Sequence, residues 1–113
     1  MIQILEKAIP LADLVSIAQG LFGDFVKAVV DVEREVIAIG GELHADEEAI
    51  LLENGSKQQH LWGINIYPAK PQKEWIEYDS MINIRPSQNN RSRGIEDLTV
   101  QKKIRQIVEK TIQ

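Results

Sequence analysis

The segment Phe25-Val26-Lys27-Ala28-Val29-Val30-Asp31-Val32-Glu33-Arg34-Glu35-Val36-Ile37-Ala38-Ile39 organises the expected fold. β-Branched residues dominate both of its ends, which is typical of strands. Because successive strand side chains point to opposite sides, Val26, Ala28, Val30 and Val32 share one face. Residues 33–35 are polar and have the length of a hairpin connection. The segment therefore predicts two antiparallel strands over residues 25–32 and 36–39.

More strands are expected on either side of this hairpin. Residues 2–5 predict a short first strand, and residues 61–67 predict a strand that ends at Pro68. Residues 75–85 predict another strand, which ends at Pro86 and pairs with the strand before it. Its core face would carry Ile76, Tyr78, Ser80, Ile82 and Ile84.

Helices are expected near both ends of the chain. Pro10 suits the first turn of a helix that Gly23-Asp24 would end. Asp97 is the expected cap of a final helix, whose apolar residues recur at helical spacing. Residues 42–55 fit either a short helix or a continued strand meander, and residues 46–54 are the least decided part. The meander is favoured slightly, because it turns Leu43 and Ala45 inward.

These elements predict one α+β domain over residues 1–113. We expect an antiparallel sheet of about four to six strands, packed by an N-terminal and a C-terminal helix that cover one face. A chain of 113 residues with 43% hydrophobic residues is large enough to bury a core. The absence of Cys excludes disulfides and zinc–thiolate sites.

Several classes of partner are not expected. No apolar run approaches the length that spans a bilayer, and the first residues do not resemble a signal peptide, so we predict a cytoplasmic protein without membrane contact. No phosphate-loop or dinucleotide motif is present, so no cofactor is predicted. The formal net charge of −4 argues against bulk binding of duplex DNA.

The net charge hides an asymmetry along the chain. Residues 31–53 carry eight acidic residues against one Arg, whereas residues 85–110 carry seven basic residues against three acidic ones. Such a split can steer a charged ligand or a second copy of the chain. The alternative is two surfaces that are simply solvated, the default for surface charge in a domain of this kind.

Three stretches together carry a family resemblance: residues 38–46 (AIGGELHAD), 61–68 (LWGINIYP) and 79–94 (DSMINIRPSQNNRSRG). In this order the chain resembles a family of short prokaryotic proteins that is known only as a domain of unknown function. The resemblance covers nearly the whole chain and implies one self-contained domain. It implies no catalytic residues, because the family has no established activity.

The strongest candidate site is the loop at residues 85–94. It brings together guanidinium groups, hydroxyls and amides ahead of the final helix, and such groups bind phosphates or carboxylates. The candidate ligand-binding residues are Arg85, Ser87, Asn89, Asn90, Arg91, Ser92 and Arg93. The alternative is an ordinary surface loop whose polar residues satisfy its own turns.

A second candidate is the trio Glu42, His44 and Asp46. On a strand these three side chains would share one exposed face, where a carboxylate could orient the imidazole for acid/base catalysis. With Glu47 or Glu48 they could also form a hard metal site, but the spacing matches no known metal motif, so no metal is predicted. The alternative is a solvated polar strand face.

These candidates lead to three functional hypotheses. The first is a module that binds a small anionic ligand, a nucleotide or an RNA end through residues 85–94. The second is a small hydrolase or nuclease, in which His44 acts with Glu42 or Asp46 and the arginine loop. The third is a structural protein that self-associates through its opposite charges. Whether the chain is an enzyme stays open, and the enzymatic hypothesis requires His44 close to the arginine loop.

Overall fold

The predicted hairpin forms the middle of the sheet in the computed structural model, which describes residues 1–113. β2 (Val26–Asp31) and β3 (Val36–Ile39) pair antiparallel. The Asp31 carboxylate closes the turn between them by accepting hydrogen bonds from the backbone N–H groups of Glu33 and Arg34, both at 2.9 Å. The local side-chain bonds therefore stabilise the hairpin that strand periodicity predicts.

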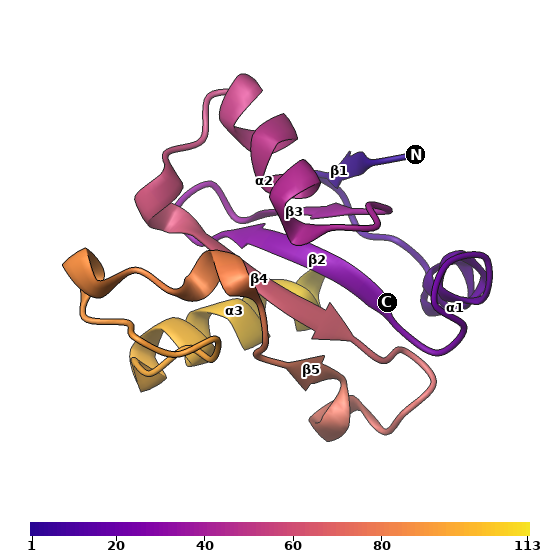
Figure 1. Cartoon of the computed structure of the whole chain (residues 1–113). Helices are drawn as coiled ribbons and strands as arrows, with labels where there is room; N and C mark the ends of the chain where they lie inside the picture. The colour runs from indigo at the N-terminus through magenta and orange to yellow at the C-terminus, as the bar shows by residue number, and fades with distance from the viewer.

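Three further strands extend the hairpin on both sides. β1 (Gln3–Leu5) pairs with β3, and β4 (Leu61–Ile66) pairs with β2. β5 (Ile76–Glu77) pairs with β4 and completes the order β1-β3-β2-β4-β5, with every neighbouring pair antiparallel. The α+β fold with one antiparallel sheet is thus confirmed (Figure 1).

The first and last helices pack on the same face of this sheet. α1 (Leu11–Gln19) ends at Gly20 rather than at the predicted Gly23. α3 (Leu98–Thr111) begins at the predicted cap, where Asp97 accepts a hydrogen bond of 2.8 Å from the backbone of Thr99. Their apolar sides join the sheet in a cluster of 17 buried residues, which is the main core.

A third helix corrects the prediction for residues 42–55. α2 (His44–Glu53) lies on the other face of the sheet, opposite α3 (Figure 1). The favoured meander is therefore wrong, as is the expectation that helices cover only one face. The inner side of α2 carries His44, Glu47 and Leu51, and only the last is apolar. Because two of the three buried residues of α2 are polar, its sequence does not show hydrophobic residues at helical spacing.

The predicted strand over residues 75–85 is also wrong beyond its first residues. After β5 the chain forms short 3₁₀ turns at Met81–Asn83 and Pro86–Gln88. The Asn83 side chain accepts a hydrogen bond from the Gly63 N–H at 2.8 Å and donates one to the Gly63 carbonyl at 2.9 Å. One side-chain amide thus replaces a neighbouring strand along this part of β4.

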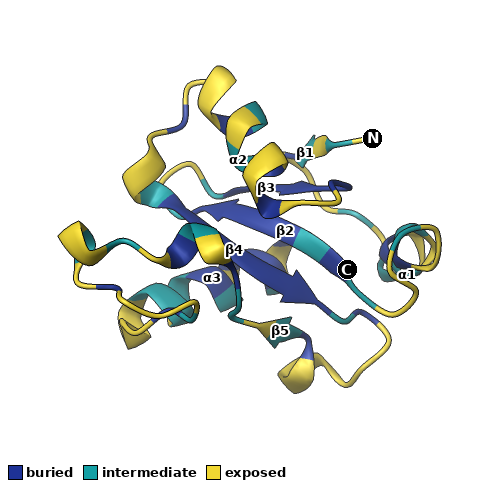
Figure 2. Cartoon of the chain, in the orientation of Figure 1, coloured by how far each residue is buried: buried dark blue, intermediate teal, exposed yellow.

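Figure 2 shows the buried sheet between exposed outer helix surfaces. The core on the α2 side contains five buried hydrophobic residues, far fewer than the main core. Lys27 and Asn65 lie on this same side of the sheet, because Lys27 alternates with the inward-facing Val26 and Ala28, and Asn65 with Ile64 and Ile66. The face under α2 is therefore apolar near Leu61 and polar near Asn65.

Candidate functional site

The side chain of Arg85, the first arginine of the predicted loop, makes its contacts with other residues of the fold. Its guanidinium stacks over the Trp62 ring, 4.2 Å from the ring centroid. It donates hydrogen bonds to the backbone carbonyls of Gln58 and Leu61. Burial lowers the pKa of Arg85, and the negative charge of Glu48 opposes this effect. Arg85 therefore anchors the loop to the beginning of β4.

Asn90 also stabilises the loop. It is buried, and its side-chain N–H groups donate to the carbonyls of Asn83 at 2.7 Å and Gly94 at 2.8 Å. Its side-chain oxygen accepts from the backbone N–H of Glu96 at 2.9 Å. These bonds satisfy the Asn90 amide inside the loop, so it has little capacity left for a ligand.

Four of the other predicted residues lie on the outer side of the loop: Ser87, Asn89, Arg91 and Ser92. Ser87 and Asn89 are exposed, and Asn89 has φ 60°, the left-handed conformation that Asn tolerates. The backbone N–H groups of Arg91 and Ser92 donate to the Glu96 carboxylate at 2.8 and 3.0 Å. These hydrogen bonds lower the pKa of Glu96.

A hollow of about 420 Å³ beside this loop includes Asn89, Asn90, Glu96 and Asp97. Its charged residues are acidic, and neither Arg91 nor Arg93 lines it. The predicted residues of the 85–94 loop therefore do not converge on one anion site.

Arg93 instead belongs to a cleft on the α2 side of the sheet. The cleft has a volume of about 410 Å³ and is lined by residues of β2, β4, β5, the beginning of α2 and the segment 79–82. Both His44 and Arg93 line it, although they come from the two separate candidate sites. Arg93 donates a hydrogen bond of 2.6 Å from Nε to the Asp79 carboxylate, which also lines the cleft.

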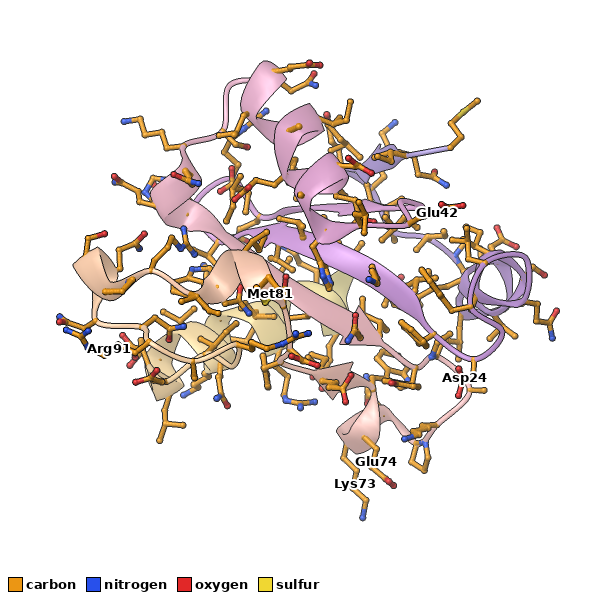
Figure 3. All side chains as sticks on the ribbon, in the orientation of Figure 1. Asp24, Glu42, Lys73, Glu74, Met81 and Arg91 are labelled. Atoms are coloured by element: carbon orange, nitrogen blue, oxygen red, sulfur yellow. The ribbon has the colours of Figure 1, made fainter.

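Arg91 does not share this position. In Figure 3 its side chain lies at the outer end of the loop, away from Met81, which lies over β4 at the cleft. The two exposed arginines are thus neighbours in sequence but have different surroundings.

The floor of the cleft is a row of three polar residues across the sheet. Lys27 of β2 is directly opposite Asn65 of β4, and Asn65 is directly opposite Glu77 of β5. Such cross-strand neighbours on one face have Cβ atoms about 5 Å apart. Lys27 forms no ion pair with any carboxylate; its Nζ lies 5.4 Å from the centroid of the Phe22 ring. It is therefore a cation of the cleft that lacks an ionic partner.

Asn65 contributes an unsatisfied acceptor to this floor. Its Nδ2 donates a hydrogen bond of 2.8 Å to the Glu77 carboxylate. Because an ionised carboxylate only accepts, this bond determines which end of the amide faces Glu77. The Asn65 Oδ1 atom is buried and has no hydrogen-bond partner. Leaving a buried acceptor unpaired costs about 1–3 kcal/mol.

His44 stands at the first turn of α2, beside Asn65, and is only 8% exposed. Its Nε2 lies 2.8 Å from the Ile64 carbonyl. Since a carbonyl only accepts, Nε2 carries the proton, and the neutral ring presents Nδ1 as an acceptor. Burial lowers the pKa of His44, whereas the Ile64 carbonyl and the nearby Asn65 side chain act in the opposite direction. At neutral pH the ring is therefore an uncharged base.

The proposed carboxylate partners of His44 do not accompany it. Because the segment is helical, Glu42 lies before α2 and Asp46 on its solvent side; both are exposed, and neither lines the cleft. Figure 3 shows Glu42 at the loop that leads into α2. The predicted shared face of Glu42, His44 and Asp46 is therefore wrong, since it requires strand geometry. The charged residues that affect the pKa of His44 are instead Lys27, which lowers it, and Asp79, which raises it.

Glu47 is the other buried polar residue of α2. It is fully buried, and its Oε2 accepts a hydrogen bond of 3.0 Å from the Gly41 N–H. Burial raises the pKa of Glu47 to about 9, so the carboxyl is neutral at neutral pH. Gly41 is required there, since a Cβ atom would come within 2.9 Å of Glu47 Cγ.

Aromatic residues lie at one end of the cleft. The rings of Phe22 and Phe25 stack with centroids 4.7 Å apart, and Phe25 contacts Tyr67 at 5.2 Å. Phe25 and Tyr67 both line the cleft. The site thus combines a polar floor with an aromatic end, as small-molecule sites commonly do.

Metal binding and membrane insertion have less support in the structure than ligand binding in the cleft. No group of three or more His, Cys, Asp or Glu side chains is placed to hold a metal ion. None of the helices combines the length and the apolar character needed to cross a membrane.

The model of the family described as "Protein of unknown function (DUF5674)" matches residues 3–111. The chain belongs to this family. The match extends from the first residue of β1 to the last residue of α3. No curated protein and no solved structure matches the chain. Because the DUF5674 family has no stated function, any function has to be argued from the cleft itself.

Of the cleft residues, sequence reasoning identified only His44 and Arg93 as candidates, and it missed Lys27 and Asn65 of the floor. A signal for Lys27 and Asn65 was present in the sequence, since each is a polar residue between apolar neighbours in a central strand. A polar residue at such a position is either paired or functional. Only the topology, which makes β2 and β4 neighbours, shows that the two lie opposite each other.

Proposed function

We propose that this DUF5674 protein binds a small ligand carrying an anionic group, such as a phosphate or a carboxylate, in the cleft between α2 and the sheet. The observation that carries the proposal is the meeting of Arg93 and His44 in one cleft with Lys27, a cation without an ionic partner. A cleft of about 410 Å³ falls within the usual range for small-molecule sites, about 300–1,000 Å³. The proposal keeps the ligand class expected from the sequence, but moves its site from the outer loop to the sheet.

The charges of the two basic residues support this choice. Lys27 supplies a point charge on the floor, and Arg93 retains donors beyond the one that binds Asp79. A partly buried ionic contact is stronger than one at the open surface, because solvent screens it less. An anionic group placed between these two cations would give Lys27 the partner that it lacks.

The test is an NMR titration of the ¹⁵N-labelled chain with inorganic phosphate, adenosine monophosphate and acetate. We expect shifts at Lys27, Asn65 and His44 that weaken as salt is added. Arg93→Gln should reduce affinity about tenfold, whereas Arg91→Gln, two positions away, should leave it unchanged. Equal losses in both variants would place the site on the outer loop, and the absence of shifts with every probe would overturn the proposal.

A second candidate is a small hydrolase in which His44 acts as the base. One observation favours it: the Ile64 carbonyl holds the proton on Nε2, and a fixed tautomer is what a general base requires. Arg93 in the same cleft would stabilise a developing phosphate charge. Hydrolysis of phosphate esters or short RNA by the wild type, lost about 100-fold or more in His44→Gln, would support it. No turnover by the wild type would count against it.

Self-association through opposite charges is a third proposal. Glu35 of the acidic segment already binds Lys103 and Lys110 of the basic segment within the chain. This pairing leaves fewer charges for a second copy, so we place the proposal below the other two. A monomer in sedimentation at low salt would overturn it.

We also propose a cytoplasmic location in a prokaryotic cell, which fractionation of the host would test.

A further inference from the structure

The cleft contains as many acidic as basic side chains. Lys27 and Arg93 are its cations, and Glu77 and Asp79 are its anions. A site for a ligand that is only anionic would be expected to carry an excess of positive charge. The balance here suits a ligand that itself carries both signs.

The two signs are separated along the floor. Lys27 and Glu77 flank Asn65 on opposite sides of the same row, because the three residues pair across β2, β4 and β5. A ligand lying along this row would meet a cation at one end and a carboxylate at the other. Such an arrangement orients a dipolar molecule.

Unused acceptors strengthen the case for a donor on the ligand. Asn65 lines the cleft and is 7% exposed, and its buried Oδ1 atom has no hydrogen-bond partner. The Glu77 carboxylate holds the amide in this orientation. In the neutral ring of His44, Nδ1 is a further acceptor, because Nε2 is committed to the Ile64 carbonyl. Buried acceptors in a native structure find donors, from protein, water or ligand.

The remaining walls are apolar. Phe25 and Tyr67 form the aromatic end, and the half-exposed Leu43 and the exposed Met81 lie at the mouth. Exposed residues of this size near a cleft favour an apolar group on the ligand.

We infer that the ligand is a small zwitterion of the amino-acid class, with an ammonium group bound at Asn65 Oδ1 and Glu77, a carboxylate bound at Lys27, and an apolar side chain toward Phe25. This inference rests on the proposed function, since it specifies the ligand of the same cleft. It adds that an ammonium group strengthens recognition beyond what the anionic group alone provides.

The experiment compares leucine and phenylalanine with their N-acetyl derivatives, by calorimetry and NMR on the full chain. The N-acetyl derivatives keep the carboxylate and the side chain but lose the ammonium group. We expect the free amino acids to bind at least about tenfold more tightly than the N-acetyl derivatives, as each lost hydrogen bond to a charged donor predicts. The amino-acid amides, which lack the carboxylate, should be weakened as well.

Asn65→Leu provides the matched variant, because it keeps the side-chain size but removes the acceptor. We expect it to abolish the preference for the free amino acid over the N-acetyl derivative. Gln106→Leu, on the exposed side of α3, is the control and should keep the preference. The unfolding curve of Asn65→Leu, measured alongside, shows whether a loss of binding reflects a loss of fold.

The outcomes separate the inference from the proposed function. Equal binding of free and N-acetylated amino acids would overturn the zwitterion but leave an anion-binding cleft. An absence of binding by amino acids, N-acetyl derivatives and phosphate alike would overturn both. A preference that survives in Asn65→Leu would remove Asn65 from the site and overturn the inference.

Discussion

The two faces of the sheet are built from different kinds of residue. The face under α1 and α3 contributes to a core of 17 buried hydrophobic residues. The face under α2 has a core of five, and around it lie buried polar residues that include Asp31, His44, Glu47, Asn65 and Asn83. A domain gains stability from apolar burial, whereas buried polar groups cost stability unless they are paired. The difference suggests that one face supports the fold and the other accommodates the candidate site.

The largest expected effect tests the unequal cores directly. Ile64 and Leu61 are both fully buried on β4 and belong to the large and small cores respectively. We expect Ile64→Ala to lower the free energy of unfolding by about 2–5 kcal/mol, and Leu61→Ala by less, because a small core near a cleft relaxes more easily around a lost side chain. Urea unfolding of both variants measures this. A larger loss in Leu61→Ala would reverse the assigned roles of the two faces.

The next effect concerns the paired polar groups of the α2 face. Asn83→Ala would leave the Gly63 N–H and carbonyl without partners inside the fold. We expect a loss of about 2–4 kcal/mol in unfolding free energy, and broadened amide signals over residues 79–94. Ser87→Ala, on the exposed turn of the same loop, should change stability by less than about 0.5 kcal/mol. Similar values for both variants would mean that water replaces the Asn83 amide at no cost.

A third test uses the buried carboxyl of Glu47. Its pKa of about 9 in the folded state lies above the ordinary value of 4.5, so the folded chain keeps a proton that the unfolded chain releases. Stability should therefore fall as the pH rises from 4.5 toward 9, by at most about 1.4 kcal/mol per pH unit. Glu47→Gln removes this dependence, and we expect it to be more stable than the wild type by about 2 kcal/mol at pH 8.

At pH 5 the order of Glu47→Gln and the wild type should reverse, because the wild type regains up to about 1.4 kcal/mol for each pH unit between 8 and 5, whereas Glu47→Gln does not. Urea unfolding at pH 5, 6.5 and 8 would show the crossing. Asp46→Asn, on the exposed side of the same helix, should keep the slope of the wild type. Parallel curves for Glu47→Gln and the wild type would show that Glu47 is ionised in the folded chain.

The same contrast explains which parts could be predicted from the sequence. The hairpin of residues 26–39 and the helix after Asp97 follow the period of their apolar residues, because each packs against the large core. α2 has polar residues on its inner side, so its period was misleading. The segment after β5 alternates like a strand, but Asn83 takes the place of the strand pairing.

The candidate site was predictable only in part, for a related reason. His44 and Arg93 were identified by residue type, but their meeting depends on two turns whose bonds come from Asn83 and Asn90. Lys27 and Asn65 face each other because of strand order, which no local pattern encodes. Long-range pairing therefore determines the site, whereas local periodicity determines the main core.

The smallest expected effect comes from Glu35, at the end of the turn before β3, and is opposite in sign to that of Glu47. Hydrogen bonds from Lys110 and Lys103 lower the pKa of Glu35 to about 2. The stability that Glu35 contributes is therefore present above pH 4.5 and lost as the pH falls toward 2.

Because the ion pairs of Glu35 with Lys103 and Lys110 are exposed, salt should screen them. We expect Glu35→Gln to lower the melting temperature slightly at pH 7 and low salt, and not at all at high salt or near pH 2. Glu33→Gln, which forms no ion pair, is the control. A difference that persists at high salt would mean that Glu35 acts through its hydrogen bonds to Lys103 and Lys110, and that the acidic and basic segments do not hold each other by long-range charge.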